Sequence, residues 1–153
     1  MSTLESSEPP TSRVLHLQPA ASGYHWVGVP VVEYKAVAEH HCGVSRSVLV
    51  GAGGERTAFH VRYFEIEPSG FSSLERHQHE HVVIVLRGQG QVRLGDAVHA
   101  VGFGDTIYVA PNEVHQLRNS STSEPFGFLC MVDAERDRPV LVTPGEQGVS
   151  TFR

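Results

Sequence analysis

The spacing of turn residues constrains the fold of this chain more than any other feature of the sequence. Between residues 58 and 133, Gly, Pro and Asp interrupt the chain roughly every eight to twelve residues. Short runs rich in β-branched and aromatic residues lie between these turns, and no stretch shows the apolar period of an amphipathic helix. A regular series of short strands separated by tight turns predicts an all-β sandwich or barrel.

The predicted strands share a short apolar stretch bounded by Gly, Pro or Asp. They cover residues 47–50, 58–66, 82–86, 91–94, 97–101, 106–109, 114–118 and 126–132. The run 82–86 is continuously apolar, which predicts a strand covered on both faces.

The sequence divides into four parts. Residues 1–22 are rich in Ser, Thr and Pro and predict a disordered or arm-like extension. Residues 23–57 contain short apolar pieces, which we expect to be strands packing on the barrel or on a partner subunit. The barrel itself is predicted over 58–133, and residues 134–153 form a C-terminal tail.

Composition narrows the function classes. A chain of 153 residues fits one domain with its own core. The net charge of −5 offers no basic surface, so we expect neither a nucleic acid nor a membrane as partner. The start of the chain lacks the basic and apolar regions of a signal peptide, which predicts a cytoplasmic protein. Cys42 and Cys130 belong to no CxxC motif, and we expect reduced thiols rather than a disulfide.

An alternating histidine motif points to metal binding. His77, His79 and His81 alternate with other residues, so in a β-strand all three side chains would face the same way. His115 follows a second strand-like run. Because imidazole is a common metal ligand, the pattern predicts a metal site built from two strands. The competing interpretation is a surface strand that is rich in histidine by chance, since the chain contains ten histidines.

Two sequence motifs resemble those of the cupin family. A Gly-x6-His-x-His element begins at Gly70 and is followed, after an apolar strand, by the segment 85–90; together they resemble the first cupin motif. The second cupin motif is resembled by Gly104, Asp105, Pro111, His115 and Asn119. The resemblance covers about half of the chain. It implies a jelly-roll barrel (a double-stranded β-helix), in agreement with the all-β pattern.

The resemblance also implies a set of metal ligands. His77 and His79 match the first two cupin ligands, and His115 matches the last. The fourth ligand of the family is usually Glu, but its place is taken here by His81. An alternative is that Glu80 serves as the carboxylate ligand after a local bulge, although strand alternation would turn it away. A site with only three protein ligands is the third possibility.

An all-imidazole site has chemical consequences. Four neutral ligands leave the full charge of a dication in the pocket, which makes the metal a stronger Lewis acid. We expect one divalent transition metal per chain, with Fe, Zn, Mn, Ni and Cu as candidates, and no organic cofactor. A purely structural zinc is disfavoured, because a jelly roll of this size has enough core without metal.

Catalytic residues are harder to identify. In the alternating strand before the first motif, either His60, Arg62 and Phe64 or Tyr63 and Glu65 would line the pocket, depending on which face points inward. Arg62, Tyr63 and Glu65 are therefore weak catalytic candidates. An inward Arg62 could bind a substrate carboxylate. The competing interpretation is a surface strand in which Arg and Glu form pairs.

Three function classes remain open. The first is a metalloenzyme acting on a small oxygenated organic molecule, with dioxygenase chemistry favoured because histidine-only cupin dioxygenases exist. The second is a non-redox isomerase, epimerase or lyase in which Glu65 or Tyr63 moves a proton. The third is a small-molecule binding or sensing module without turnover. We also expect a homodimer, since Tyr24, Trp26 and Val27 are suited to crossing onto a second subunit.

Overall fold

Strands and turns make up the whole described part of the protein. The computed structural model describes residues 8–34 and 42–143, and it contains no helix in these ranges. Within them, no helix is therefore long and apolar enough to cross a membrane. The strands are β1 (Leu17–Gln18), β2 (His25–Trp26), β3 (Val32–Glu33), β4 (Cys42–Val50), β5 (Phe59–Phe71), β6 (Glu75–Arg76), β7 (His81–Arg87), β8 (Gly90–Leu94), β9 (Ala97–Val101), β10 (Thr106–Val109), β11 (His115–Asn119), β12 (Phe126–Asp133) and β13 (Val140–Leu141).

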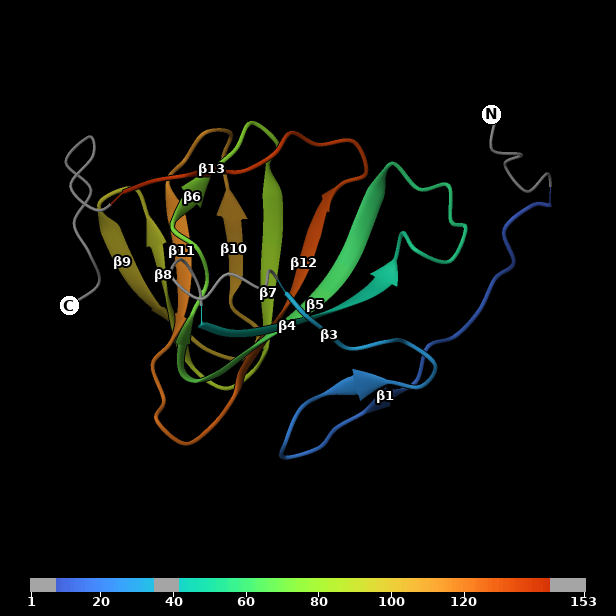
Figure 1. Ribbon diagram of the computed structural model, residues 1–153, viewed down its shortest axis with the longest axis horizontal. Helices are drawn as coiled ribbons and strands as arrows, with labels where there is room; N and C mark the ends of the chain where they lie inside the picture. The colour runs from blue at the N-terminus through green and yellow to red at the C-terminus, as the bar shows by residue number, and fades with distance from the viewer. Residues whose placement is uncertain (1–7, 35–41, 144–153) are drawn as a thin grey trace.

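One continuous, strongly curled sheet forms the barrel (Figure 1). Its strand order is β10-β7-β12-β5-β11-β6-β13; β4 and then β3 extend it beyond β5, and β8 and then β9 extend it beyond β11. The long strand β5 joins the two sides of the barrel, because its early residues pair with β12 and its last residue, Phe71, pairs with Arg118 of β11. This arrangement confirms the predicted all-β barrel.

The barrel encloses an apolar core supplied mainly by β4, β5, β7, β8, β10, β11 and β12. In β7, Val83 and Val85 are fully buried, whereas Val82 and Ile84 on the other face are half-buried. The expectation that this run is covered on both faces is therefore only partly correct. The core cluster contains Val44, Phe64, Ile66, Val83, Val85, Val92, Ile107, Val109, Leu117, Phe126, Phe128 and Cys130.

Strand β5 is longer than the sequence predicts. The segment Pro68-Ser69-Gly70 indicates a turn after residue 66, but β5 continues to Phe71. Ser69 has a positive φ of 62°, and its backbone N–H donates to the carbonyl of Ser121 rather than to a regular ladder partner. Residues that normally end a strand are tolerated here because β5 bends from one side of the barrel to the other.

The N-terminal segment packs on the outside of β5 of the same chain. The Trp26 ring meets the Tyr63 ring edge-on at 5.0 Å, and Tyr24 stacks on Tyr63 at 6.4 Å. The backbone N–H of Tyr24 also donates to the Glu65 carboxylate at 3.0 Å. Of the two places expected for this segment, the structure shows packing on its own barrel. Part of the expected segment, residues 35–41, lies outside the described residues.

Candidate metal centre

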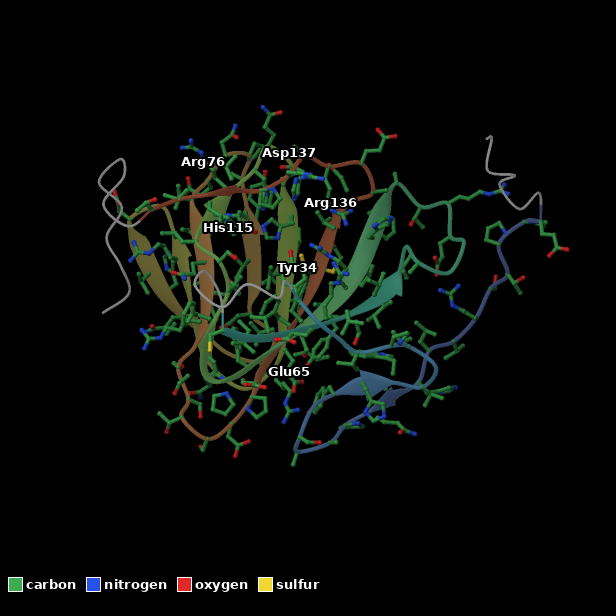
Figure 2. The ribbon with its side chains drawn as sticks, in the orientation of Figure 1. Tyr34, Glu65, Arg76, His115, Arg136 and Asp137 are labelled. Atoms are coloured by element: carbon green, nitrogen blue, oxygen red, sulfur yellow. The ribbon has the colours of Figure 1, made fainter. Side chains whose placement is uncertain are left out.

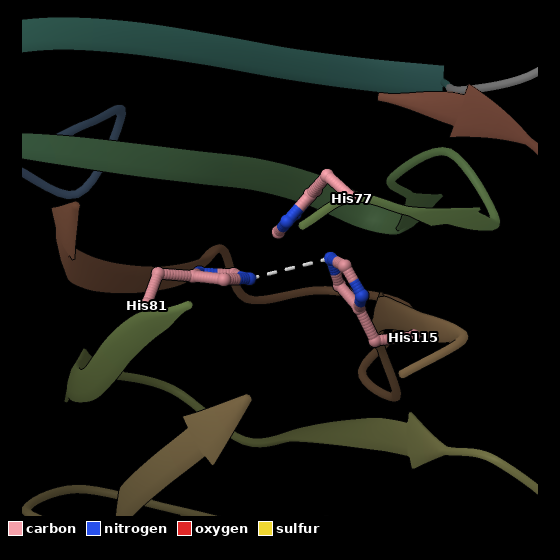
Figure 3. Close-up of side chains that lie close together, drawn as sticks. All are labelled: His77, His81 and His115. Carbon is pink, nitrogen blue, oxygen red and sulfur yellow. Dashed lines mark hydrogen bonds between the residues drawn. The ribbon is translucent and has the colours of Figure 1, made fainter. Parts of the chain in front are cut away.

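Three buried histidines converge inside the barrel (Figure 3). His77 follows β6, His81 is the first residue of β7, and His115 is the first residue of β11. Their side chains are 4%, 8% and 3% exposed, and their ligand atoms all lie within 4.8 Å of one another. The Nε2 atoms of His81 and His115 are only 3.3 Å apart. This geometry is compatible with a single metal ion bound by all three rings.

The proton positions of two rings follow from their partners. His77 Nδ1 lies 2.6 Å from the carbonyl oxygen of His79, and His115 Nδ1 lies 2.8 Å from that of Glu113. A carbonyl oxygen only accepts hydrogen bonds, so each neutral ring carries its proton on Nδ1. Each Nε2 therefore has a free lone pair, and such backbone contacts are the usual means of orienting metal-binding imidazoles.

The cluster is held in the uncharged form that binds metals. Burial first, and then the neighbouring His115, lower the pKa of His77 to about 4. Burial, followed by His115 and His77, lowers the pKa of His81 to about 2. Burial likewise lowers the pKa of His115. Protons therefore compete little with a metal ion near neutral pH. The residues present thus fit a transition metal in donor type, protonation and spacing.

His79 lies beside this cluster without being part of it. Its ring stacks on the His77 ring at 3.7 Å with an angle of 2° between the planes, and its centroid is 6.4 Å from that of His81. His79 Nδ1 donates to the Asp137 carboxylate at 2.8 Å, which leaves Nε2 with a free lone pair. The assignment of His79 as a ligand stays a prediction.

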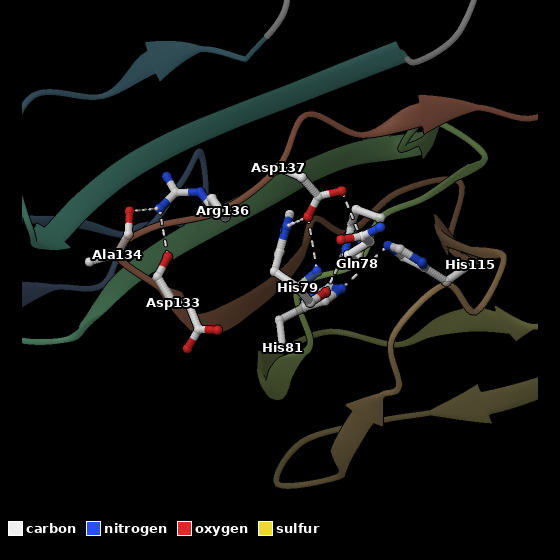
Figure 4. A network of polar contacts seen from close by, with 9 residues as sticks. Gln78, His79, His81, His115, Asp133, Ala134, Arg136 and Asp137 are labelled. Carbon is white, nitrogen blue, oxygen red and sulfur yellow. Dashed lines mark hydrogen bonds and ion pairs between the residues drawn. The ribbon is translucent and has the colours of Figure 1, made fainter.

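Asp137 fixes the loop that carries two of the histidines (Figure 4). Besides the His79 ring, its carboxylate accepts the backbone N–H groups of Gln78 and His79, each at 2.9 Å. These backbone hydrogen bonds are the largest cause of the lowered pKa of Asp137. The C-terminal tail therefore supplies an ionised group that orders the loop before β7.

The strand geometry predicted for the histidine motif is wrong. Residues 77–80 form a bend, because β6 ends at Arg76 and β7 begins at His81. The backbone groups of the bend bond to Asp137 and to the N–H of Asn112 instead of to a ladder. Simple alternation therefore does not apply. Glu80 is exposed and accepts a hydrogen bond from the Tyr108 hydroxyl, so its carboxylate is bound at the outer face of the barrel.

A cavity of about 200 Å³ lies next to the cluster and extends toward β4 and β5. Its wall includes the three histidines of the first motif, His115 of the second, and Arg46, Arg62, Phe64, Glu75, Cys130 and Arg136. The Cys130 thiol lies 3.4 Å from His81 Nδ1 and 3.4 Å from Arg62 Nη2, so it stands between the two. Cys42 and Cys130 are both free thiols, as expected.

The face of β5 that carries Arg62 and Phe64 points into the cavity. Arg62 and Phe64 line the cavity, whereas Tyr63 and Glu65 lie on the opposite face, where the Tyr63 hydroxyl donates to Glu65 at 2.7 Å. Figure 2 shows Glu65 on the far side of the barrel from His115 and Arg136. The alternative that placed Tyr63 and Glu65 in the pocket is wrong. His60 is not among the lining residues of this cavity.

Several site residues were not identified from the sequence. Arg46 lies in β4, and Arg136 and Asp137 lie in the tail after β12. In the sequence they are distant from both histidine motifs, although they line the same cavity. None of them stands in a local pattern that indicates a binding site. The close succession of charged residues in 133–138 is the one signal that could have directed attention to the tail.

A small β-barrel with an internal histidine cluster defines the class of this protein. The cupin domain model matches residues 62–132. A relative from Rhodospirillum rubrum, named 1-methylthio-D-xylulose 5-phosphate methylsulfurylase, is 42% identical over 130 residues, which cover 84% of this chain and 81% of that protein. The chain belongs to the cupin family.

Solved structures agree with this assignment. A crystal structure of a cupin-2 domain from Rhodospirillum rubrum is 42% identical with a TM-score of 0.75, covering 82% of this chain and 83% of that one. A cupin 2 conserved barrel protein from Rhodopseudomonas palustris is 40% identical with a TM-score of 0.75, covering 86% and 87%. The similarity therefore extends beyond the two motifs to most of the barrel and to the strands before it.

Proposed function

We propose that this protein is a metal-dependent enzyme acting on a phosphorylated ketose that carries a methylthio group. The named relative supports this substrate class, because it is 42% identical over most of both chains. As its name states, the substrate of that relative has a methylthio group at carbon 1 of a ketose and a phosphate at carbon 5. The keto carbon lies next to the carbon that bears sulfur.

The observation that carries the proposal is the convergence of three uncharged imidazoles on a cavity of small-molecule size. A bound metal ion would supply a Lewis acid that polarises a keto or hydroxyl oxygen. The histidine cluster would hold the ion through Nε2, while the Nδ1 contacts keep the rings in place. Phe64 and Phe128, stacked at 5.7 Å, and Leu117 provide an apolar wall that limits access of water.

His79 is proposed as a fourth ligand. Its Nε2 is free, and its ring lies against that of His77, one of the three clustered histidines. The Asp137 carboxylate keeps the His79 proton on Nδ1, which leaves Nε2 as the atom that could bind a metal. Glu80 is not proposed, since its carboxylate is bound to Tyr108 at the outer face.

The relative favours chemistry that does not use oxygen over dioxygenase chemistry for this chain. The dioxygenase expectation rests on the histidine motif and the resemblance to cupins, whereas a named relative supports a reaction on a sulfur-bearing sugar phosphate. In such a reaction a side chain of the cavity would move a proton to or from the sugar. Tyr63 and Glu65 lie outside the cavity, so Glu75, a cavity-lining residue of β6, replaces them as the proposed group.

Turnover of the substrate named for the relative tests the proposal. Protein loaded with Mn²⁺, Fe²⁺, Ni²⁺, Zn²⁺ or Cu²⁺ is incubated with 1-methylthio-D-xylulose 5-phosphate and a small thiol, with and without oxygen. We expect substrate loss that is independent of oxygen, is abolished in His115→Ala and persists in His99→Ala, an exposed control. Oxygen consumption that depends on substrate would contradict the proposal and support a dioxygenase. Binding without turnover for every metal would support the binding module.

We further propose a cytoplasmic homodimer. The two free thiols support a reducing compartment. The exposed apolar residues Val27, Val31 and Val32 support association through the N-terminal segment. Light scattering of the purified protein should give twice the monomer mass, and a monomer at micromolar concentration would contradict the dimer.

A further inference from the structure

Three guanidinium groups line one part of the cavity without a carboxylate partner. They belong to Arg46 of β4, Arg62 of β5 and Arg136 after β12. Throughout residues 8–34 and 42–143, no ion pair joins any of the three to an acidic side chain. The Nε atoms of Arg46 and Arg62 are also buried without a hydrogen-bond partner. Arg46 and Arg62 are half-buried and Arg136 is exposed at the edge of the cavity. Like charges gathered on one wall repel one another, so an anion bound between them would be stabilised.

Neighbouring groups hold these side chains while leaving N–H groups available. Arg46 lies 5.2 Å from the centroid of the Tyr34 ring, and Arg62 lies 4.9 Å from that of Phe64. Stacking on an aromatic face fixes a guanidinium plane but uses few of its donors. Arg136 is fixed by its backbone, because its Nη1 donates to the carbonyl of Asp133 at 2.9 Å.

The three groups are close enough to affect one another. Burial first, and then the charges of Arg62 and, more weakly, Arg46, lower the pKa of Arg136. The carboxylate of Asp137, also on the cavity wall, is already engaged by the loop of His79. Glu75 is the other carboxylate on this wall, and among the described residues no ion pair joins it or Asp137 to Arg46, Arg62 or Arg136.

We propose that Arg46, Arg62 and Arg136 form an anion site that binds the phosphate group of the substrate, with the sugar extending from there to the histidine cluster. This inference rests on the proposed function. A phosphate monoester carries nearly two negative charges and several acceptor oxygens, which suit a set of guanidinium forks. The Cys130 thiol connects the two regions, since it contacts both Arg62 and His81 at 3.4 Å. One end of a small substrate can thus be held while the other end reaches the cluster.

Binding of a phosphorylated and an unphosphorylated sugar to the metal-loaded protein tests the anion site. Calorimetry with D-xylulose 5-phosphate, D-xylulose and inorganic phosphate is carried out on the parent, Arg46→Gln and Arg136→Gln. Arg56→Gln, an exposed arginine that does not line the cavity, is the matched control for charge. In each cavity variant, the affinity for the phosphorylated sugar and for phosphate should fall about ten- to hundredfold, as expected for the loss of a charged hydrogen bond. D-xylulose affinity and metal content should not change.

The outcomes separate this inference from the proposed function. Equal affinity of D-xylulose 5-phosphate for the parent and both cavity variants, at unchanged metal content, would overturn the anion site. An equal loss in Arg56→Gln would also overturn it, because the effect would then reflect overall charge. If the cavity variants weaken phosphate binding but the methylthio substrate is never turned over, the anion site stands and the proposed function fails. If turnover occurs with an unchanged KM in both variants, the function stands and the anion site fails.

Discussion

Acid should destabilise the metal-free protein through its buried histidines. The pKa of His77 is lowered from 6.5 to about 4, and that of His81 from 6.5 to about 2. Below about pH 6.5 the unfolded chain therefore binds protons that the folded chain excludes. The free energy of unfolding must fall as the pH falls through this range, and for His77 the loss is complete near pH 4. The lowered pKa of Asp137 acts only below its ordinary value of 3.8, outside this window.

The size of the effect follows from the number of excluded protons. Each histidine that is neutral in the folded state and charged in the unfolded state changes the folding equilibrium by about tenfold per pH unit. His77 and His81 together give about a hundredfold per unit between about pH 6 and pH 4. His115 adds to the effect in the same direction, because its pKa is also lowered. Residual hydration of the cavity reduces these values, so they are upper limits.

Urea denaturation monitored by fluorescence measures this dependence. Chelator-treated parent protein, His81→Gln and the exposed control His99→Gln are unfolded at about pH 7, 6 and 5. In His99→Gln, the unfolding equilibrium should depend on pH as it does in the parent. In His81→Gln, the change in the unfolding equilibrium per pH unit should be about tenfold smaller than in the parent. An identical slope in His81→Gln, or a parent stability that does not change over this range, would refute the assignment of neutral buried imidazoles.

Three further substitutions probe the loop, the core and the sheet. Asp137→Asn should reduce metal affinity about ten- to hundredfold in calorimetry, since His79 loses its ionised partner; unchanged affinity would exclude His79 as an oriented ligand. Asn119→Ala should lower the free energy of unfolding by about 1–3 kcal/mol, because the buried carbonyl of Ile66 and the part-buried carbonyl of Glu124 lose their donor. Gly127→Ala should lower it by about 1–3 kcal/mol, because a Cβ there would overlap the Tyr63 hydroxyl and lie 2.7 Å from Cζ. An unchanged denaturation midpoint in either variant would contradict these contacts.

The fold could be predicted from the sequence because its signals are local. Turn residues and β-branched runs are read within about ten residues, and they placed the barrel strands near their observed positions. The prediction that the strand ends before Pro68 is wrong for a physical reason. A bend between the two sides of a barrel needs the same residues as a turn, and only the pairing of β5 with both sides distinguishes the two.

The site could be predicted only in part. The clustering of His77, His81 and His115 followed from their spacing and from the resemblance to cupins. The bend at His79 did not, because it depends on a carboxylate nearly sixty residues later in the chain. The arginines of the anion site come from three distant segments. Such convergence is a property of the folded barrel, and no local period of the sequence encodes it.

The metal content of the purified protein tests the central claim most directly. Parent, His77→Ala, His81→Ala, His115→Ala and Glu80→Ala are loaded with the same metal, dialysed and measured by elemental mass spectrometry. The three buried imidazoles predict about one ion per chain in the parent and in Glu80→Ala, with loss of the ion in each histidine variant. Full metal content in the histidine variants, or its loss in Glu80→Ala alone, would contradict the account.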